Sequence, residues 1–450
     1  MGRMLSRLRD GVRRLTASPG DRGQIQRDAV TAFLIRVLSA GILYLSQIVL
    51  ARWMGGFEYG IYVFVWTWVL VLGGLANLGI SMVMIRLLPD YRERGELDLA
   101  RGLLRYGRLM TFGASTLVAV LGLGGLKLFG AALSSYYVLP AYLALVCIPM
   151  VTLTDVQDGI GRARGWMSVA LLPPYVLRPL LVLMAMTLAH ELGWPMAAET
   201  AAGSAIFATW VTAGVQTLLV QRRLADDIPK GPLQRTPDLW LKTSLPLLAI
   251  TGSELLLQNT DVIIISHFMQ PSDAAIYFAA AKTMSLVMFV HYAVGSAMAN
   301  RFSTLGARGD AESLQAFVRD AVHWTFWPSL AGALAILTFG WPLLRLFGPQ
   351  FTAGYPVMFI LVLGFLGRAA RGPSEFMLNM LGQQKACAIV IAAMAALNIG
   401  LNILLVPRFG ILGAATATAF ALVLGALLNT IVARRRLGLD IAIWSHLGRR

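Results

Sequence analysis

The chain has 450 residues, of which 57% are hydrophobic and only 14% are charged. Soluble domains carry about 25% charged residues, so this composition excludes an ordinary soluble protein and favours one embedded in lipid. The net charge of +15 would indicate nucleic-acid binding in a soluble protein, but here the basic residues separate long apolar blocks, which is the pattern of membrane proteins.

The N-terminal segment, residues 1–27, is rich in arginine and lacks the apolar run of a cleavable signal peptide. Leu5, Leu8, Val12 and Leu15 recur at helical spacing among the arginines. This spacing predicts a short basic helix on the membrane surface. A disordered basic tail is the alternative.

Twelve apolar blocks follow, and each is long enough to cross a bilayer as a helix of about 20 residues. The chain is therefore predicted to be an all-α polytopic membrane protein. The predicted spans are 29–51, 61–86, 107–129, 137–160, 168–190, 199–221, 244–268, 275–300, 321–344, 355–381, 386–406 and 411–433.

The distribution of lysine and arginine predicts the orientation of the chain. Of the 38 basic residues, 29 lie in the termini and in the turns on one side of the spans, and four lie on the other side, namely Arg52, Lys127, Arg345 and Arg408. Basic loops stay in the cytoplasm. The chain is therefore predicted to be a multi-pass protein of a bacterial inner membrane with both termini in the cytoplasm.

The two halves of the chain resemble each other at a constant offset of 215 residues. Two bundles of six helices in the same orientation are typical of transporters built from parallel repeats; chance similarity between apolar segments is the alternative. The predicted bundles are residues 28–225 and 244–436, joined by a cytoplasmic linker, 226–243, and followed by a cytoplasmic tail, 437–450. The aligned pairs are Met54 with Met269, Glu58 with Asp273, Ile61 with Ile276, Tyr62 with Tyr277, and Arg86 with Arg301.

Five basic residues fall inside predicted spans, where each costs about 2.5–3.5 kcal/mol if it faces lipid. We therefore expect them to line an aqueous cavity between the bundles. Guanidinium and ammonium groups in such a cavity suit phosphate. These candidate substrate-binding residues are Arg36, Arg178, Lys282, Arg368 and Arg371.

Several of these cations have a simpler explanation. Arg36 and Lys282 lie about two turns from a span end and can extend toward the membrane surface. Arg371 and Glu375 are four residues apart, so they can neutralise each other on one helix face.

Arg178 is the hardest of the five to explain without a function, because it lies near mid-span. Pro179 follows it, and Pro173 and Pro174 precede it by one turn. These prolines predict a kinked helix, and the carbonyl groups freed by a kink suit the wall of a cavity.

The spans also contain a few carboxylates. Glu254, Gln258 and Asp261 follow helical spacing as one polar stripe, and Asp155 and Asp158 lie near the inner end of the fourth span. Such carboxylates either couple transport to H⁺ or Na⁺ or serve as counter-ions of the buried arginines. The candidates for ion coupling are Glu254, Asp261 and Asp155.

Other polar patterns favour structure over catalysis. Asn398 and Asn402 are four residues apart, which predicts hydrogen bonds between helices. The sequence contains no metal-protease, phosphate-loop or paired-cysteine motif. The sequence therefore predicts neither an enzyme nor a metal or organic cofactor.

Three segments resemble the polysaccharide transporter branch of the multidrug/oligosaccharidyl-lipid/polysaccharide flippase superfamily. The run SQIVLARWMGGFEYGIYVFVWTWVLVLGGLANLGIS from Ser46 is similar to the first two helices and first outer turn of that family. Asp261 with Tyr277 is similar to the matching turn of the second half, and PRFGILGAATATA from Pro407 to the junction into the last helix. The resemblance covers residues 28–436.

The resemblance implies a V-shaped pair of six-helix bundles that works by alternating access. The implied cargo is an undecaprenyl-pyrophosphate-linked oligosaccharide that moves from the cytoplasmic to the periplasmic leaflet for O-antigen, capsule or exopolysaccharide synthesis. Twelve spans lack the extra helix pair of lipid II flippases, which disfavours a peptidoglycan precursor. Implied partners are this cargo, membrane lipid, and, as candidates, a polysaccharide polymerase and a chain-length regulator; nucleic acid is not among them.

Two other functions fit a polytopic chain of this kind. A multidrug exporter of the same superfamily would need an acidic cavity for cationic cargo, and the five intramembrane cations argue against it. A membrane polymerase or glycosyltransferase would need acidic residues in a sizeable outer loop, and every predicted outer loop has about ten residues or fewer.

Overall fold

The computed structural model describes residues 21–446, and their side chains except those of residues 21–34, 36, 132, 300, 445 and 446. The predicted N-terminal surface helix lies outside the described residues. The first half contains α2 (Asp21–Ala76), α3 (Ile80–Glu93), α4 (Leu97–Phe129), α5 (Ser135–Leu145), α6 (Ile148–Ala163), α7 (Met167–Leu172), a π-helical turn (Pro173–Leu177), α8 (Arg178–Glu191) and α9 (Ala198–Asp227).

The second half is also helical, and no strand occurs between residues 21 and 446. It contains α10 (Pro237–Phe268), α11 (Pro271–Ser285), α12 (Met288–Arg308), α13 (Ala311–Thr338), α14 (Gly340–Phe347), α15 (Tyr355–Ala369), α16 (Ser374–Met380), α17 (Gln384–Leu437) and a last 3-10 turn, Ile443–His446.

The helices account for the predicted membrane crossings. Seven are long and apolar enough to span a membrane, and three bent pairs bring the number to ten. Two of the seven, α2 and α17, each break once, at Gly55 (φ 75°) and Gly410 (φ 59°), where the left-handed backbone favours glycine. Each of these two therefore crosses twice, which confirms a polytopic all-α fold of twelve spans.

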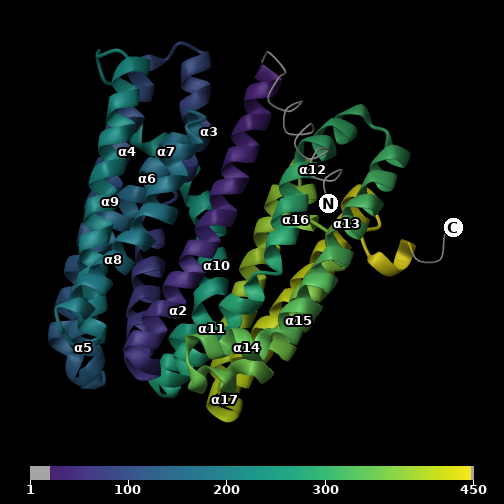
Figure 1. Cartoon of the computed structure of the whole chain (residues 1–450). Helices are drawn as coiled ribbons and strands as arrows, with labels where there is room; N and C mark the ends of the chain where they lie inside the picture. The colour runs from purple at the N-terminus through teal and green to yellow at the C-terminus, as the bar shows by residue number, and fades with distance from the viewer. Residues whose placement is uncertain (1–20, 447–450) are drawn as a thin grey trace, which may run out of the picture.

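The helices form two bundles that lie close together at one end and diverge toward the other (Figure 1). We call the diverging end, with the turns at residues 94–96, 164–166, 228–236 and 309–310, the basic end. We call the opposite end, with the turns at residues 55, 192–197, 269–270, 348 and 410, the closed end. Helices α2 and α10 lie between the two bundles, and α2 contacts both α10 and α11.

Direct contacts join the two bundles at the closed end. Arg52 Nε donates a hydrogen bond to the carbonyl oxygen of Leu346 at 2.7 Å. The fully buried ring of Tyr59 meets the ring of Phe351 edge-on, with 6.1 Å between centroids. Aromatic pairs of this geometry contribute about 0.5–1.5 kcal/mol beyond area burial, so these contacts stabilise the closed arrangement.

Gly60 lies at a close approach between the bundles, because a Cβ at this position would lie 1.8 Å from the backbone oxygen of Pro271. We expect Gly60→Ala to force the helices apart and to destabilise the protein by about 1–3 kcal/mol, the usual cost of overpacking. The midpoint of thermal unfolding in one detergent measures this loss. Gly113→Ala in α4 is the control, since nothing lies within 4 Å of its Cβ position, and an equal midpoint in both variants would contradict the expectation.

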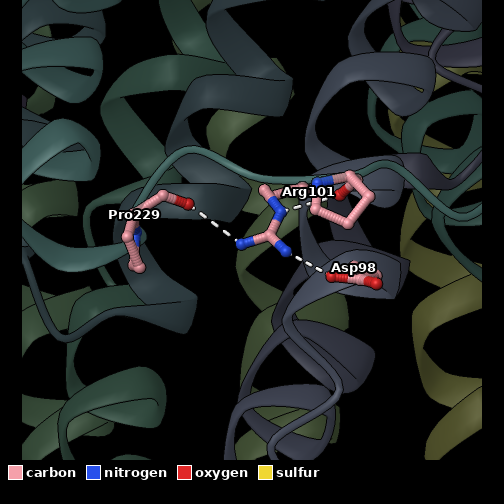
Figure 2. A network of polar contacts seen from close by, with 4 residues as sticks. Asp98, Arg101 and Pro229 are labelled. Carbon is pink, nitrogen blue, oxygen red and sulfur yellow. Dashed lines mark hydrogen bonds and ion pairs between the residues drawn. The ribbon is translucent and has the colours of Figure 1, made fainter.

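One arginine holds the linker between the halves against the first bundle. Arg101 on α4 donates from Nε to the carbonyl oxygen of Pro232 at 2.8 Å and from Nη1 to that of Pro229 at 2.9 Å. Its Nη2 pairs with Asp98, one turn away (Figure 2). The backbone amide of Gln234 donates to the carbonyl oxygen of Asp98 at 3.0 Å. The linker is therefore fixed to α4.

We expect Arg101→Ala to release this linker, because hydrogen bonds from charged donors contribute about 1.5–3 kcal/mol each. Protease cleavage within residues 228–236 should become about tenfold faster, since a tenfold change corresponds to only about 1.4 kcal/mol. Timed digestion with a mass-spectrometric readout measures it. Arg105→Ala removes an exposed arginine one turn further along α4 and should leave the rate unchanged.

Helix α10 belongs to both bundles. Near the basic end, Trp240 is fully buried in the first bundle and its Nε1 donates to the hydroxyl of Tyr91 at 3.1 Å. Near the closed end, Asp261 of the same helix accepts a hydrogen bond from Asn402 of the second bundle at 2.8 Å. Pro246 lies inside the helix between these two contacts.

Some predicted boundaries are wrong. The first helix already includes Asp21, well before the predicted start at residue 29. Its first turns are polar, and a prediction based on apolar residues does not detect them. The predicted span 61–86 breaks at residues 77–79, where Leu78 (φ 53°) and Gly79 (φ 72°) adopt left-handed backbone. A leucine in that conformation carries no sequence signal.

Candidate functional site

The five predicted cavity cations do not form one cluster. The side chain of Arg36 lies outside the described part of the chain. Lys282 is exposed on α11, with Nζ 5.1 Å from the centre of the Phe278 ring. Arg371 is only 5% exposed, and its guanidinium lies 4.9 Å from the ring centre of Trp444 in the last turn. The tail thus covers Arg371.

The predicted Arg371–Glu375 pair is wrong. Helix α15 ends at Ala369 and α16 begins at Ser374, so the two residues do not share one helix face. Glu375 instead accepts a hydrogen bond from Nη2 of Arg368 in an ion pair. Because the break contains Gly372 with φ 59°, residues four apart across it do not lie on the same helix face.

Arg178 is a half-buried arginine on the first bundle. Its guanidinium lies 5.5 Å from the ring centre of Trp66 on α2 and makes no ion pair or hydrogen bond with the described residues. A cation in contact with an aromatic face is stabilised by about 0.5–2 kcal/mol, which holds the side chain in place while its N–H donors stay available.

The prolines beside Arg178 coincide with an irregular turn in the helix. Residues Pro173–Leu177 form a π-helical turn between α7 and α8, with both Pro173 and Pro174 buried. Such turns occur at functional sites because they displace one face of the helix. Arg178 is the first residue after the turn.

Two carboxylates lie on α6, and one of them interacts with Arg178 at longer range. Asp158 pairs with Arg162 at 2.6 Å, one turn along the same helix. Asp155 interacts electrostatically with both Arg178 and Arg162. Asp155 therefore partly balances the charge of Arg178, although the two side chains do not form a direct ion pair.

The second bundle contains a polar cavity of about 270 Å³. Glu254 and Gln258, two residues of the predicted polar stripe, are exposed and line this cavity. Arg368 lines it as well. The remaining lining residues come from α10, α12, α16 and α17, namely Leu257, Tyr292, Glu375, Phe376, Asn379, Ile391 and Met394.

The third stripe residue, Asp261, lies apart from that cavity in a buried network. It is 6% exposed. Its carboxylate accepts hydrogen bonds from the Tyr277 hydroxyl, from Thr418 Oγ1 at 2.6 Å and from Asn402 Nδ2 at 2.8 Å. Asn398 Nδ2 donates to Thr418 Oγ1 at 3.0 Å. The predicted inter-helix bonds of Asn398 and Asn402 are confirmed.

Two oxygen atoms of this network have no hydrogen-bond partner among the described residues. The side-chain oxygens Asn398 Oδ1 and Asn402 Oδ1 are buried and make no hydrogen bond with the residues that the structure describes. A carboxylate with amide and hydroxyl oxygens is the ligand type of hard cations. Since the site has a single carboxylate, one Na⁺ ion or one proton on Asp261 would neutralise its charge.

Sequence analysis missed several of these residues. Thr418 lies in an alanine-rich helix beside Thr416, and only the structure shows that Thr418 faces Asp261, whereas Thr416 is exposed and donates to its own helix backbone. Asn379 and Tyr292 also line the polar cavity, and the sequence analysis singled out neither of them.

A larger and mostly apolar recess of about 970 Å³ lies between the bundles near the closed end. Its walls include Trp68 and Leu126 of the first half and Ile264 and Ile403 of the second half.

Comparisons with known proteins identify the family and the fold. Residues 25–305 match the family described as polysaccharide biosynthesis protein. The chain is 25% identical over 170 residues to the "Probable low-salt glycan biosynthesis flippase Agl15" of Haloferax volcanii, which is 38% of this chain and 36% of that protein. It is 27% identical over 178 residues to an uncharacterised membrane protein, MJ1068, of Methanocaldococcus jannaschii, covering 39% and 34%. The matches thus span about a third of these relatives.

Solved structures share the fold at low identity. An inward-facing multidrug resistance MATE family transporter of the MOP superfamily superposes with a TM-score of 0.74 and 14% identity, over 90% of this chain and 98% of that one. The lipid II flippase MurJ in an inward closed conformation gives 0.71 and 14%, over 90% and 87%. The MATE transporter in an outward-facing conformation gives 0.62 and 16%, over 90% and 96%.

Proposed function

Because the chain belongs to the polysaccharide biosynthesis protein family, we propose that it is a flippase that moves a polyprenyl-pyrophosphate-linked oligosaccharide from the cytoplasmic to the periplasmic leaflet of a bacterial inner membrane. The observation that carries the proposal is Arg178. It is a guanidinium without an ion pair, next to a π-helical turn and near the middle of the apolar span Met167–Glu191. Agl15 and MurJ, which are named as flippases, support the class of cargo.

The proposed mechanism is alternating access. The bundles are in contact at the closed end and diverge at the basic end, so the headgroup enters from the basic end. By the charge rule the basic end is cytoplasmic. The pyrophosphate binds Arg178 through charge-assisted hydrogen bonds, and the polyprenyl tail stays in lipid. Separation of the closed-end contacts then releases the headgroup on the other side.

The network around Asp261 would supply the driving force. A Na⁺ ion held by Asp261 with the free oxygens of Asn398 and Asn402, or a proton on Asp261, changes how strongly α10 is bound to α17. A ligand shifts a two-state equilibrium only through different affinities for the two states. Ion binding at this helix pair provides such a difference.

The proposal is tested in liposomes that contain the purified protein and an undecaprenyl pyrophosphate linked to a fluorescently labelled oligosaccharide. A membrane-impermeant quencher added outside bleaches only the outer leaflet. We expect the protected inner-leaflet fluorescence to disappear when the protein is present and to persist in protein-free liposomes. Persistence in both would overturn the proposed function.

A further inference from the structure

The polar cavity of the second bundle has the wrong charge for a pyrophosphate. It is lined by two carboxylates, Glu254 and Glu375, and by one guanidinium, Arg368. Arg368 is already paired with Glu375, so the three charged groups together leave one net negative charge. Like charges repel strongly where the dielectric constant is low, so an anionic ligand is disfavoured here although Arg368 was predicted to bind one.

The cavity instead presents polar groups that lack partners. The side chains of Glu254, Gln258 and Asn379 make no hydrogen bond or ion pair with the described residues, and Arg368 Nε is buried without an acceptor. The side chains of Glu254, Gln258 and Asn379 therefore provide carboxylate acceptors and amide donors and acceptors. Hydroxyl groups, which both donate and accept, are complementary to such a mixed set.

One wall of the cavity is aromatic. The rings of Tyr292 and Phe376 meet nearly perpendicularly, at 81° and 6.3 Å between centroids, and Tyr292 is 46% exposed. A sugar ring has an apolar face of C–H groups beside its rim of hydroxyls, and aromatic side chains pack against such faces. The volume of about 270 Å³ is close to the lower limit of about 300 Å³ for small-molecule sites.

We propose that this cavity binds one uncharged sugar residue of the cargo while Arg178 of the first bundle holds the pyrophosphate. The inference rests on the proposed function and adds to it a glycan subsite. Glu254, Gln258 and Asn379 bind the hydroxyls, and Arg368 acts as a positioning residue that fixes Glu375. Each bundle thus recognises a different part of one headgroup.

The test compares lipid binding to the full-length protein in nanodiscs by native mass spectrometry. The probes are undecaprenyl pyrophosphate alone, the same lipid carrying glucose, galactose or N-acetylglucosamine, and the organic cation tetraphenylphosphonium. We expect at least one sugar-bearing lipid to bind about tenfold more tightly than the bare lipid. Glu254→Leu should abolish this preference, Glu254→Gln should reduce it, and Glu312→Gln, at an exposed carboxylate of α13, should leave it intact.

Retained affinity for the bare lipid shows that a variant is folded. Equal affinity for bare and sugar-bearing lipids in the wild type, or a preference that survives Glu254→Leu, would overturn the glycan subsite and leave the flippase proposal standing. Binding of tetraphenylphosphonium that depends on Glu254 would assign the cavity to cations and would also overturn the subsite. If none of the four lipids bound, both the subsite and the proposed function would fall.

Discussion

Asp261→Asn is expected to abolish ion-driven transport while leaving a folded protein. Inter-helix hydrogen bonds in membranes contribute about 0.6 kcal/mol on average and at most about 1.7 kcal/mol. Asparagine keeps one acceptor for Tyr277, Thr418 and Asn402, so the loss of stability should be on the order of 1 kcal/mol. The loss of the charge, however, removes the proton or Na⁺ site entirely.

The measurement is initial flipping rate in liposomes under an imposed Na⁺ or pH gradient. Wild-type protein should accelerate with one of these gradients, and Asp261→Asn should show the same rate with and without it. Asp273→Asn is the matched control, because Asp273 only caps the start of α11 by accepting from the amide of Gln270 at 3.2 Å. A gradient response retained by Asp261→Asn would remove Asp261 from coupling.

Arg178→Ala is expected to weaken binding of undecaprenyl pyrophosphate by about tenfold to a hundredfold. Charge-assisted hydrogen bonds contribute about 1.5–3 kcal/mol, and a tenfold change corresponds to about 1.4 kcal/mol. Arg178→Lys should recover only part of the affinity, since lysine retains the charge but loses the planar fork that binds two oxygens. Titration of the purified variants with the bare lipid measures both effects.

The chain provides a matched control for this arginine. Arg345 also contacts a tryptophan, with its guanidinium 5.2 Å from the ring centre of Trp341, but it lies on α14 at the closed end. Arg345→Ala should therefore keep wild-type affinity. Equal affinity in Arg178→Ala and wild-type protein would show that the pyrophosphate binds elsewhere.

The fold was largely predictable because it depends mainly on the order of apolar blocks and basic turns along the sequence. Twelve apolar blocks and alternating basic turns follow from the requirements of the bilayer, and the breaks at Gly55 and Gly410 fall between predicted spans. The break at residues 77–79 was not predicted: Gly79 favours the left-handed backbone and packs closely against α10, but Leu78 has no such preference. Local propensity gives way there to tertiary contacts.

The site was less predictable, because spacing along a helix does not specify which neighbour a side chain meets. Glu254 and Asp261 are seven residues apart on α10, yet one borders a polar cavity and the other is enclosed by α11 and α17. The intramembrane cost of charge drew attention to Arg178 and Arg368 as residues that need an explanation. It could not show that Arg368 is neutralised by Glu375 across a break between two helices.

The way in which α10 is shared between the bundles has a mechanical consequence. The contacts at Trp240 and Asp261 lie about 30 Å apart along this helix, at 1.5 Å per residue. Any change in the angle between the bundles must therefore appear as curvature of α10. Pro246, which has no amide hydrogen to donate, is where that curvature costs least. Since the segment beyond the proline carries Asp261, the backbone that bends is continuous with the carboxylate proposed to bind the coupling ion.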